Sequence, residues 1–219
     1  MFLHGYLSSK ESFYPQINYF SRHFRVTAPD LPGFGGSGPI PAAWSVGEYA
    51  DWLEGFLKER GIVFPCVIAH SFGGRVAIKC LARGLFDRAV LTGCAGIVRR
   101  RTLSYHLRVK SYRLVRKFAP RFAEAKFGSA EYRSLSPLMR ESYKKIVNED
   151  LREEAKRIAR PVLYLNGERD RETPLSSVRI LHECTAGSRL AVLKGCGHFA
   201  HLEEPLLFDL AAEEFLNDA

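Results

Sequence analysis

The sequence predicts an α/β fold in which helices cover both faces of a doubly wound, mostly parallel sheet. Short apolar runs without polar alternation, typical of strands buried on both faces, alternate along the chain with segments of helical periodicity. Of the 219 residues, 46% are hydrophobic and 26% are charged, which is enough apolar material for a substantial core. No stretch approaches the ~18 uncharged apolar residues that a membrane-spanning helix needs.

Five runs of strand length are bounded by glycine, proline or aspartate. They lie at Phe24–Ala28, Cys66–Ala69, Ala89–Thr92, Val162–Leu165 and Leu190–Leu193. Helices are expected over Val46–Arg60, Gly73–Ala82 and Leu206–Leu216. A further apolar run, residues 1–3, has the composition of the last residues of a buried strand.

The alternation of strands and helices stops between Thr92 and Pro161. Connections in α/β folds usually have about 2–6 residues. We therefore predict that residues 99–160 form a helical lid, inserted into a core made of residues 1–98 and 161–219. This insertion carries 18 Lys and Arg against 7 Asp and Glu, while the whole chain has a net charge of +8. All of the basic excess lies in the predicted lid.

The five cysteines are widely spaced and include no C-x-x-C pair. An odd number of cysteines with this spacing is typical of free thiols in a reducing compartment, and it argues against a disulfide framework and a zinc site. The N-terminus has neither the basic segment nor the apolar segment of a secretory signal. These features together predict a cytoplasmic protein.

Ser71 lies between a predicted strand and a predicted helix, in the sequence A-H-S-F-G-G of residues 69–74. Small residues two before and two after a serine permit the sharp turn that exposes a nucleophilic hydroxyl at a helix N-terminus, where the helix dipole favours a developing anion. A serine at this position can instead be an ordinary helix N-cap. The motif alone leaves both interpretations open.

Two other side chains favour the nucleophile. Asp170 and His198 lie in the loops that follow the last two predicted strands. The carboxyl ends of parallel strands meet at one edge of a sheet, where ligands bind. A serine nucleophile needs a base, and that base needs an acid to fix its tautomer. Ser71, Asp170 and His198 are therefore predicted to form a catalytic triad.

Five motifs, in this order, resemble those of the α/β-hydrolase superfamily, in its serine branch with a helical lid. They are H-G-Y at 4–6, D-L-P-G-F-G-G-S at 30–37, A-H-S-F-G at 69–73, G-E-R-D-R-E-T-P at 167–174 and G-H-F-A-H-L-E-E-P at 197–205. The resemblance covers nearly the whole chain except the predicted lid. It implies Ser71 as nucleophile, His198 as base and Asp170 as acid. It also implies that the backbone N–H groups of Tyr6 and Phe72 form the oxyanion hole.

The chain departs from the family pattern in two places. Ala69 stands where the serine turn usually has its first glycine, a mild change because alanine is also small. The family also has two strands and the start of a third before its His-Gly turn, and the third strand lies inside the sheet. We therefore expect either that the native chain starts further upstream or that this is a trimmed variant with an exposed sheet edge.

Other residues compete for the same roles. Asp30 is a rival acid, but it follows an early strand and is expected to order the turn after it. His201 is a rival base that we interpret as structural. His4 and His70 are expected to support the site without contacting the substrate, and no feature marks Cys196 as a nucleophile.

The resemblance implies hydrolysis of a carboxylic ester through an acyl-enzyme on Ser71, with no metal or organic cofactor. Two alternatives remain open. Carbon–carbon hydrolases that act on ring-cleavage dienoates have the same triad, although many carry Asn where this chain has His70. The third hypothesis is a catalytically inactive binding protein with the α/β-hydrolase fold.

The expected partner is a small-molecule acyl substrate, whose identity the sequence does not predict. The basic side chains of the predicted lid are either a solvated helical face or an attraction for an anionic substrate or an acidic carrier protein. They include Arg99, Arg108, Lys110, Arg113, Arg116 and Lys117. Nucleic acid is not expected as a partner, because this charge would lie at the entrance of an acyl-transfer site.

Overall fold

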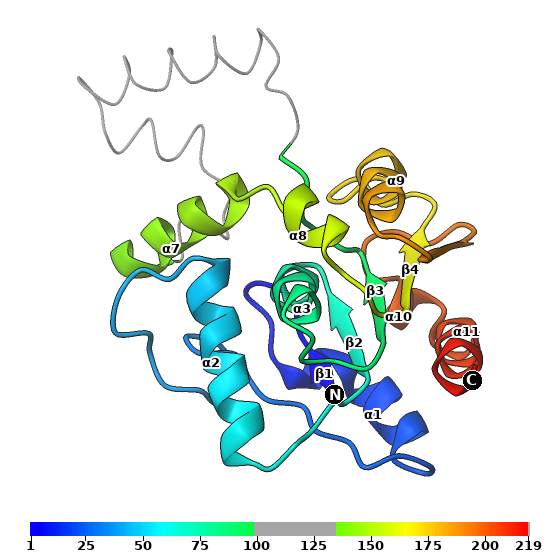
Figure 1. The fold of residues 1–219 in the computed structure, drawn as a ribbon, viewed down its shortest axis with the longest axis horizontal. Coiled ribbons are helices and arrows are strands. Elements are labelled where there is room, and N and C mark those ends of the chain that lie inside the picture. Colours follow the sequence, from blue (N-terminus) through cyan, green and yellow to red (C-terminus); the bar gives the residue numbers. More distant parts are fainter. Residues whose placement is uncertain (99–134, 219) are drawn as a thin grey trace, which may run out of the picture.

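The computed structural model describes residues 1–98 and 135–218. Its sheet has five strands: β1 (Phe2–Leu3), β2 (Val67–His70), β3 (Ala89–Thr92), β4 (Val162–Gly167) and β5 (Arg189–Leu193). All neighbouring pairs are parallel, and the strands lie across the sheet in the same order as along the chain (Figure 1). The carboxyl ends of all five strands therefore meet at one edge.

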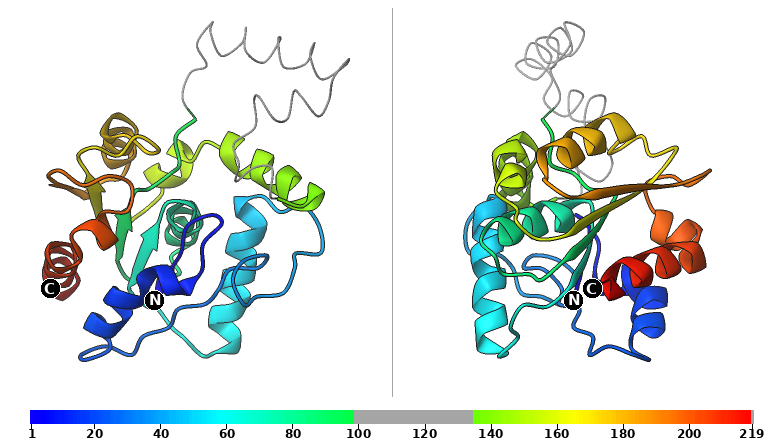
Figure 2. Two further views of the ribbon diagram at one scale, coloured as in Figure 1. Left: turned by 180° about the vertical axis from the view of Figure 1, so that it is seen from behind. Right: turned by 45° about the vertical axis from the view of Figure 1, so that its right-hand side comes forward.

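Helices cover both faces of this sheet (Figure 2). One face carries α2 (Val46–Glu59), α3 (Phe72–Ala82), α8 (Arg152–Lys156) and α9 (Leu175–Cys184). The other face carries α1 (Tyr14–Phe20) and α11 (Pro205–Asn217). The remaining described helices are η1 (Lys10–Phe13), α7 (Pro137–Asn148) and α10 (Ala200–Glu203).

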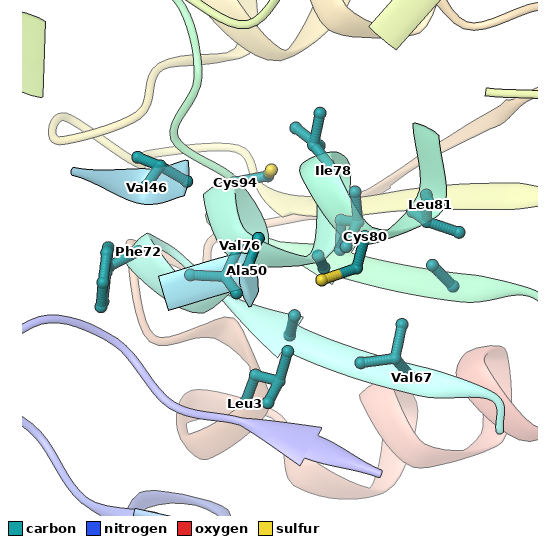
Figure 3. Packing of buried hydrophobic residues seen from close by; sticks show 14 of the residues in the cluster. Leu3, Val46, Ala50, Val67, Phe72, Val76, Ile78, Cys80, Leu81 and Cys94 are labelled. Atoms are coloured by element: carbon teal, nitrogen blue, oxygen red, sulfur yellow. The ribbon is translucent and has the colours of Figure 1, made fainter. Parts of the chain in front are cut away.

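Two apolar layers form because successive residues of a strand point to opposite faces. The row that faces α1 and α11 consists of Phe2, Ile68, Val90 and Leu163, which are in register. The row that faces α2 and α3 consists of Leu3, Ala69, Leu91 and Tyr164. Figure 3 shows Leu3 of this layer beneath the apolar side chains of α3. Full burial of such an aliphatic side chain contributes about 1.5–3 kcal/mol.

The predicted strands are confirmed with one exception. Phe24–Ala28 is not a strand, so that prediction is wrong. The segment lies beside β1 and is joined to it by one backbone hydrogen bond, from Phe2 N–H to Thr27 C=O (2.9 Å). A two-residue strand offers too few partners for a longer ladder. β1 also lies at the edge of the described sheet, not inside it.

The helices predicted over 46–60, 73–82 and 206–216 correspond to α2, α3 and α11. Ser45 and Glu48 form a capping box that fixes the start of α2. Sequence periodicity did not predict α1 and α9, because their buried positions include the polar residues Gln16 and Ser177.

Part of the predicted lid, residues 99–134 with its cluster of basic side chains, lies outside the described residues. The remainder of that segment contains α7 and α8. α7 is held on the core by hydrogen bonds from Ser142 Oγ to Trp44 C=O (2.6 Å) and from Tyr6 Oη to Met139 C=O (3.0 Å). No helix in the described part of the chain has the length and apolarity to cross a bilayer. The five cysteines are free.

Candidate active site

Ser71 lies at the junction of β2 and α3 in a backbone conformation that is rare for a residue with a side chain, with φ 50° and ψ −107°. Such strain costs about 1–3 kcal/mol and persists only where the surroundings hold it. Here the Ser71 N–H donates to Thr92 C=O (3.0 Å), which fixes the turn to the end of β3. The Ser71 hydroxyl does not cap α3. The alternative of an ordinary N-cap serine is therefore wrong.

Gly73 allows the helix to start this close to the neighbouring strand. A Cβ on Gly73 would lie 2.2 Å from the carbonyl oxygen of Leu3 and 2.7 Å from that of His4. Both contacts are with backbone atoms, so a side chain would force β1 and α3 apart. The glycine that follows the serine turn is thus required by packing between β1 and α3.

A cavity of about 600 Å³ opens at the carboxyl edge of the sheet. Four of the five predicted site residues line it: Tyr6, Ser71, Phe72 and His198. Its other walls include Gly5, His70, Arg75, Tyr143, Thr173 and Phe199. The loops after β1, β2, β4 and β5 all contribute, as the position of ligand sites in open parallel sheets predicts.

The fifth predicted residue, Asp170, lies behind His198, with its side chain fully buried. Its Oδ2 is 2.9 Å from His198 Nδ1. It also accepts hydrogen bonds from Thr173 Oγ1 (2.7 Å) and from the backbone N–H of Glu172 and Thr173 (both 2.9 Å). Burial alone would raise the pKa of the Asp170 carboxyl, but the hydrogen bonds from His198 and Thr173 outweigh it and hold that pKa below its usual value. Asp170 therefore stays ionised beside His198.

Ser71 and His198 line the same cavity but are not hydrogen-bonded to each other. Ser71 Oγ donates to no partner within residues 1–98 and 135–218. The hydrogen bonds of a nucleophile and its base are often long without substrate and shorten when substrate binds. The structure thus brings the three predicted triad residues to one place and joins two of them directly.

The backbone N–H groups of Tyr6 and Phe72 donate to no other residue in the described part of the chain. Phe72 is the first residue of α3, and the first N–H groups of a helix have no partner within it. The Tyr6 ring packs against Phe34, Phe72 and Tyr143, with ring centroids 4.8, 5.4 and 5.1 Å away. Both N–H groups are therefore available to an oxygen atom in the cavity.

Two of the competing residues have structural partners. Asp30 accepts from the N–H groups of Lys10 (2.7 Å) and Gly36 (2.8 Å), so it orders the turn after it, as predicted. His4 is buried, and its Nε2 accepts from the N–H of Leu31 (2.9 Å). Its Nδ1–H therefore donates to Gly5 C=O (2.8 Å), and burial lowers its pKa. His4 joins the turn of Gly5 and Tyr6 to the Asp30 loop.

Sequence reasoning missed Arg75, which lines the cavity one helical turn after Ser71. Its side chain is buried, and Nη1 donates to the backbone carbonyl of Glu149 (2.7 Å). Arg75 forms no ion pair with any residue of the described ranges, whereas Lys79, one turn further along α3, pairs with both Glu149 (2.6 Å) and Glu154 (3.0 Å). Burial lowers the pKa of the Arg75 guanidinium, yet arginine remains cationic in proteins. Arg75 and Lys79 are the two charges on an otherwise apolar helix, and the position of Arg75, four residues after Ser71, was the available signal.

No group of three or more His, Cys, Asp or Glu side chains in the described ranges could hold a metal ion. The chemistry that the site can perform with its own groups is attack by a hydroxyl, proton transfer by an imidazole and stabilisation of an oxyanion.

Comparisons with known proteins agree with this fold. A family model described as "Alpha/beta hydrolase family" matches residues 1–209, so the chain belongs to the α/β-hydrolase family. The 2-succinyl-6-hydroxy-2,4-cyclohexadiene-1-carboxylate synthase of Salmonella paratyphi A is 29% identical over 233 residues, which cover 94% of this chain and 88% of that protein.

Two solved structures share the fold. The enol-lactonase from Burkholderia xenovorans LB400 superposes with a TM-score of 0.77 at 22% identity, over 99% of this chain and 90% of that one. A meta-cleavage product hydrolase from Pseudomonas fluorescens IP01 superposes with a TM-score of 0.74 at 24% identity, over 99% and 89%. Family and neighbours together support an enzyme of the hydrolase class.

Proposed function

We propose that this protein is a serine hydrolase that cleaves a carboxylic ester through an acyl-enzyme formed on Ser71. The observation that carries the proposal is the Asp170–His198 hydrogen bond of 2.9 Å beside a strained Ser71 that lines the same cavity. An aspartate on Nδ1 places the proton there and leaves Nε2 free to accept the serine proton.

In the acylation step, Ser71 Oγ forms a bond to the ester carbonyl carbon while its proton moves to His198 Nε2. The carbonyl oxygen becomes an oxyanion that accepts hydrogen bonds from the N–H groups of Tyr6 and Phe72. The loss of one such donor costs about 100- to 1000-fold in kcat in serine hydrolases. The C–O bond to the alcohol then breaks, and the leaving alkoxide takes the proton from His198.

In the deacylation step, a water molecule attacks the acyl-enzyme while His198 Nε2 takes one of its protons. The second oxyanion collapses, the bond to Ser71 Oγ breaks, and Oγ recovers its proton from His198. The products are the carboxylic acid and the free enzyme, and the protons balance without a metal or an organic cofactor.

The substrate class that we propose is an ester that also carries a free carboxylate group, which Arg75 binds. A buried cation without a counter-ion is costly, and buried charges are normally paired. Arg75 has five N–H donors; one donates to the Glu149 carbonyl and none to a carboxylate of the described residues, so a carboxylate in the cavity can accept from the others. The curated relative from Salmonella carries a carboxylate in the name of its product, in keeping with this class.

Covalent labelling tests the nucleophile. A fluorophosphonate probe should label the wild type and fail to label Ser71→Ala, because the probe needs an activated serine. Labelling that persists in Ser71→Ala would contradict the assignment of Ser71. If the probe labels Ser71 and the enzyme cleaves the carbon–carbon bond of a dienoate but hydrolyses no ester, the carbon–carbon hydrolase replaces the proposal. A folded wild type that resists the probe would favour the inactive binding protein.

Arg75→Met and Lys79→Met test the substrate class as a matched pair. Both substitutions remove a cation of α3 that contacts the α7–α8 corner, but only Arg75 lines the cavity. Arg75→Met should raise KM about 10- to 100-fold for an ester with a free carboxylate and leave KM for a neutral aryl ester within about twofold. Lys79→Met should affect both esters equally. If Arg75→Met changes KM equally for the two esters, Arg75 has a purely structural role.

A further inference from the structure

The loop that carries His198 has to cross the sheet to reach Ser71. His198 follows β5, whereas Ser71 follows β2, and β3 and β4 lie between these strands. The loop packs directly against the ends of the strands between. A Cβ on Gly167, at the end of β4, would lie 2.1 Å from the carbonyl oxygen of Gly197. A Cβ on Gly93, after β3, would lie 3.0 Å from the His198 ring. The strand ladder itself does not fix where this loop ends above β2.

One hydrogen bond spans the whole crossing. His70, the last residue of β2 and the neighbour of Ser71 in the chain, places its Nε2 3.0 Å from the backbone carbonyl oxygen of His198. A carbonyl only accepts, so Nε2 carries the proton and donates. The bond thus joins the residue beside the nucleophile to the backbone of the base.

The surroundings of His70 keep it in this state. The side chain is 2% exposed, and its ring lies 4.7 Å from the ring of His198, 4.8 Å from that of His201 and 5.1 Å from that of Phe199. Its pKa lies well below the usual value because of burial, and protonated neighbours at His201 and His198 would lower it further. His70 is therefore neutral and has a single tautomer that can donate.

Other hydrogen bonds of the His198 loop do not reach β2. The loop after β4 holds it through Arg169 N–H to Cys196 C=O (2.8 Å) and Gly195 N–H to Glu168 Oε2 (3.0 Å). Glu203 accepts from the N–H groups of Gly197 (2.7 Å) and Phe199 (3.3 Å), but all three residues belong to the same loop and the short helix after it. These bonds shape the loop without tying it to β2. His70 alone, among the side chains described, bridges the Ser71 turn and the His198 backbone by a hydrogen bond.

We propose that His70 is a positioning residue: its Nε2–H, bound to the His198 carbonyl, sets the distance between the nucleophile turn and the base. The inference rests on the proposed roles of Ser71 and His198. It predicts that the chemical step needs a hydrogen-bond donor at the Nε2 position and that substrate binding does not need this donor.

Three substitutions of His70 separate the donor from the ring. His70→Gln keeps an N–H donor near the position of Nε2, His70→Asn carries the donor on a side chain too short to reach, and His70→Phe keeps the ring and removes the donor. His70→Phe and His70→Asn should lower kcat for a neutral aryl ester about 10- to 100-fold and change KM less than about threefold. His70→Gln should stay within about fivefold of the wild type.

His201→Phe is the matched control. His201 is also a buried histidine whose ring contacts His70, but it makes no hydrogen bond to His198 in the described part of the chain. If the effect at His70 came only from disturbing the histidine cluster, His201→Phe would reproduce it. We expect His201→Phe to keep kcat within about twofold.

The proton on His198 Nδ1, which bonds to Asp170, gives a readout that does not depend on turnover. This proton should give a separate downfield NMR signal that persists in His70→Gln and His201→Phe and broadens or disappears in His70→Phe and His70→Asn. Equal losses of signal and kcat in His70→Gln and His70→Phe, or no loss in either, would overturn the proposal. If the wild type neither turns over esters nor takes the fluorophosphonate, the function in the preceding subsection fails, and the NMR series still tests the contact.

Discussion

Polar side chains are buried on both sides of the His198 loop. Asp170 on the cavity side and His201 on the other side differ in whether their side chains have hydrogen-bond partners. Toward the cavity, Asp170 is paired with His198 and with Thr173. Toward α1 and α11, both ring nitrogens of His201, one oxygen of Asp209 and the side-chain oxygen of Gln16 have no hydrogen-bond partner among the described residues. The backbone of Ser12 lies near enough to His201 to raise its pKa slightly, yet outside hydrogen-bond geometry.

This difference separates two uses of a buried polar group. Paired groups hold one geometry and one protonation state, which a catalytic acid and base require. The two titratable groups on the other side, His201 and Asp209, have pKa values shifted by burial, so they make stability depend on pH. Substitutions on the paired side should therefore change rate, and substitutions on the unpaired side should change the pH dependence of unfolding.

The largest effect is expected from replacing Asp170, the carboxylate that is hydrogen-bonded to His198 and Thr173. Asp170→Asn should lower kcat about 10³- to 10⁴-fold, because the amide no longer holds His198 in the tautomer that accepts a proton. The fold should persist, since Asn can keep part of the hydrogen bonding to Thr173. Steady-state kinetics and circular dichroism measure both. Asp30→Asn, which removes a carboxylate from a loop without contact to His198, should act on stability; the reverse pattern would mean that Asp30 is the acid.

On the unpaired side, His201→Phe should remove an acid-dependent loss of stability. Burial and the neighbouring His198 lower the pKa of His201 to about 4, against about 6.5 in an unfolded chain. The unfolded state then binds more protons between these values, so stability falls as the pH drops from about 6.5 to about 4, by roughly 3 kcal/mol in total. Urea unfolding from about pH 4.5 to about pH 7.5 should show a shallower acid loss in His201→Phe. The same slope in both proteins would refute the prediction.

Asp209→Asn should act in the opposite direction. Burial raises the pKa of Asp209 to about 6, although a hydrogen bond from Gln16 partly lowers it. The folded state binds the extra proton here, so this group destabilises the protein as the pH rises from about 4 to about 6. Asp209→Asn should therefore stabilise the fold by roughly 2–3 kcal/mol at about pH 8 and little at about pH 4. Glu214→Gln, an exposed charge on the same helix, is the control and should leave the free energy of unfolding nearly unchanged.

The smallest effect should come from Thr173→Val, which removes one of the hydrogen bonds to Asp170 and keeps the shape of the side chain. We expect a loss of about tenfold in kcat, because the His198 and backbone hydrogen bonds to the carboxylate remain. Thr173→Ser retains the hydroxyl and should stay near the wild type. A larger loss in Thr173→Ser than in Thr173→Val would show that packing, and not the hydrogen bond, is what Thr173 supplies.

The sequence predicted the parts of the site that local motifs specify. Ser71 needs small neighbours for a sharp turn, and Asp170 and His198 follow strands whose ends must converge, so their positions along the chain sufficed. The failed strand at Phe24–Ala28 has the right composition, but pairing depends on the length of the neighbouring strand.

The missed groups depend on contacts between distant elements. The burial and the hydrogen bond of Arg75 are decided by α7 and α8, about 70 residues away along the chain. Whether His201 finds a partner is decided by η1 and α11. No local pattern carries that information. The bond between His70 and His198 joins residues that are 128 positions apart and has the same origin.

The strand order has a consequence for synthesis on the ribosome. Each strand from β2 to β5 adds to the same growing edge of the sheet, so the sheet can form one strand at a time as the chain emerges, at about 5–20 residues per second. Ser71 is fixed in its turn once β3 is made, while the segments that hold Asp170 and His198 are still to be translated. A chain released early therefore carries Ser71 without the histidine that we propose as its base. On the proposed mechanism, incomplete translation products are expected to be inert, and hydrolytic activity is expected only once β5 and the His198 loop have been added.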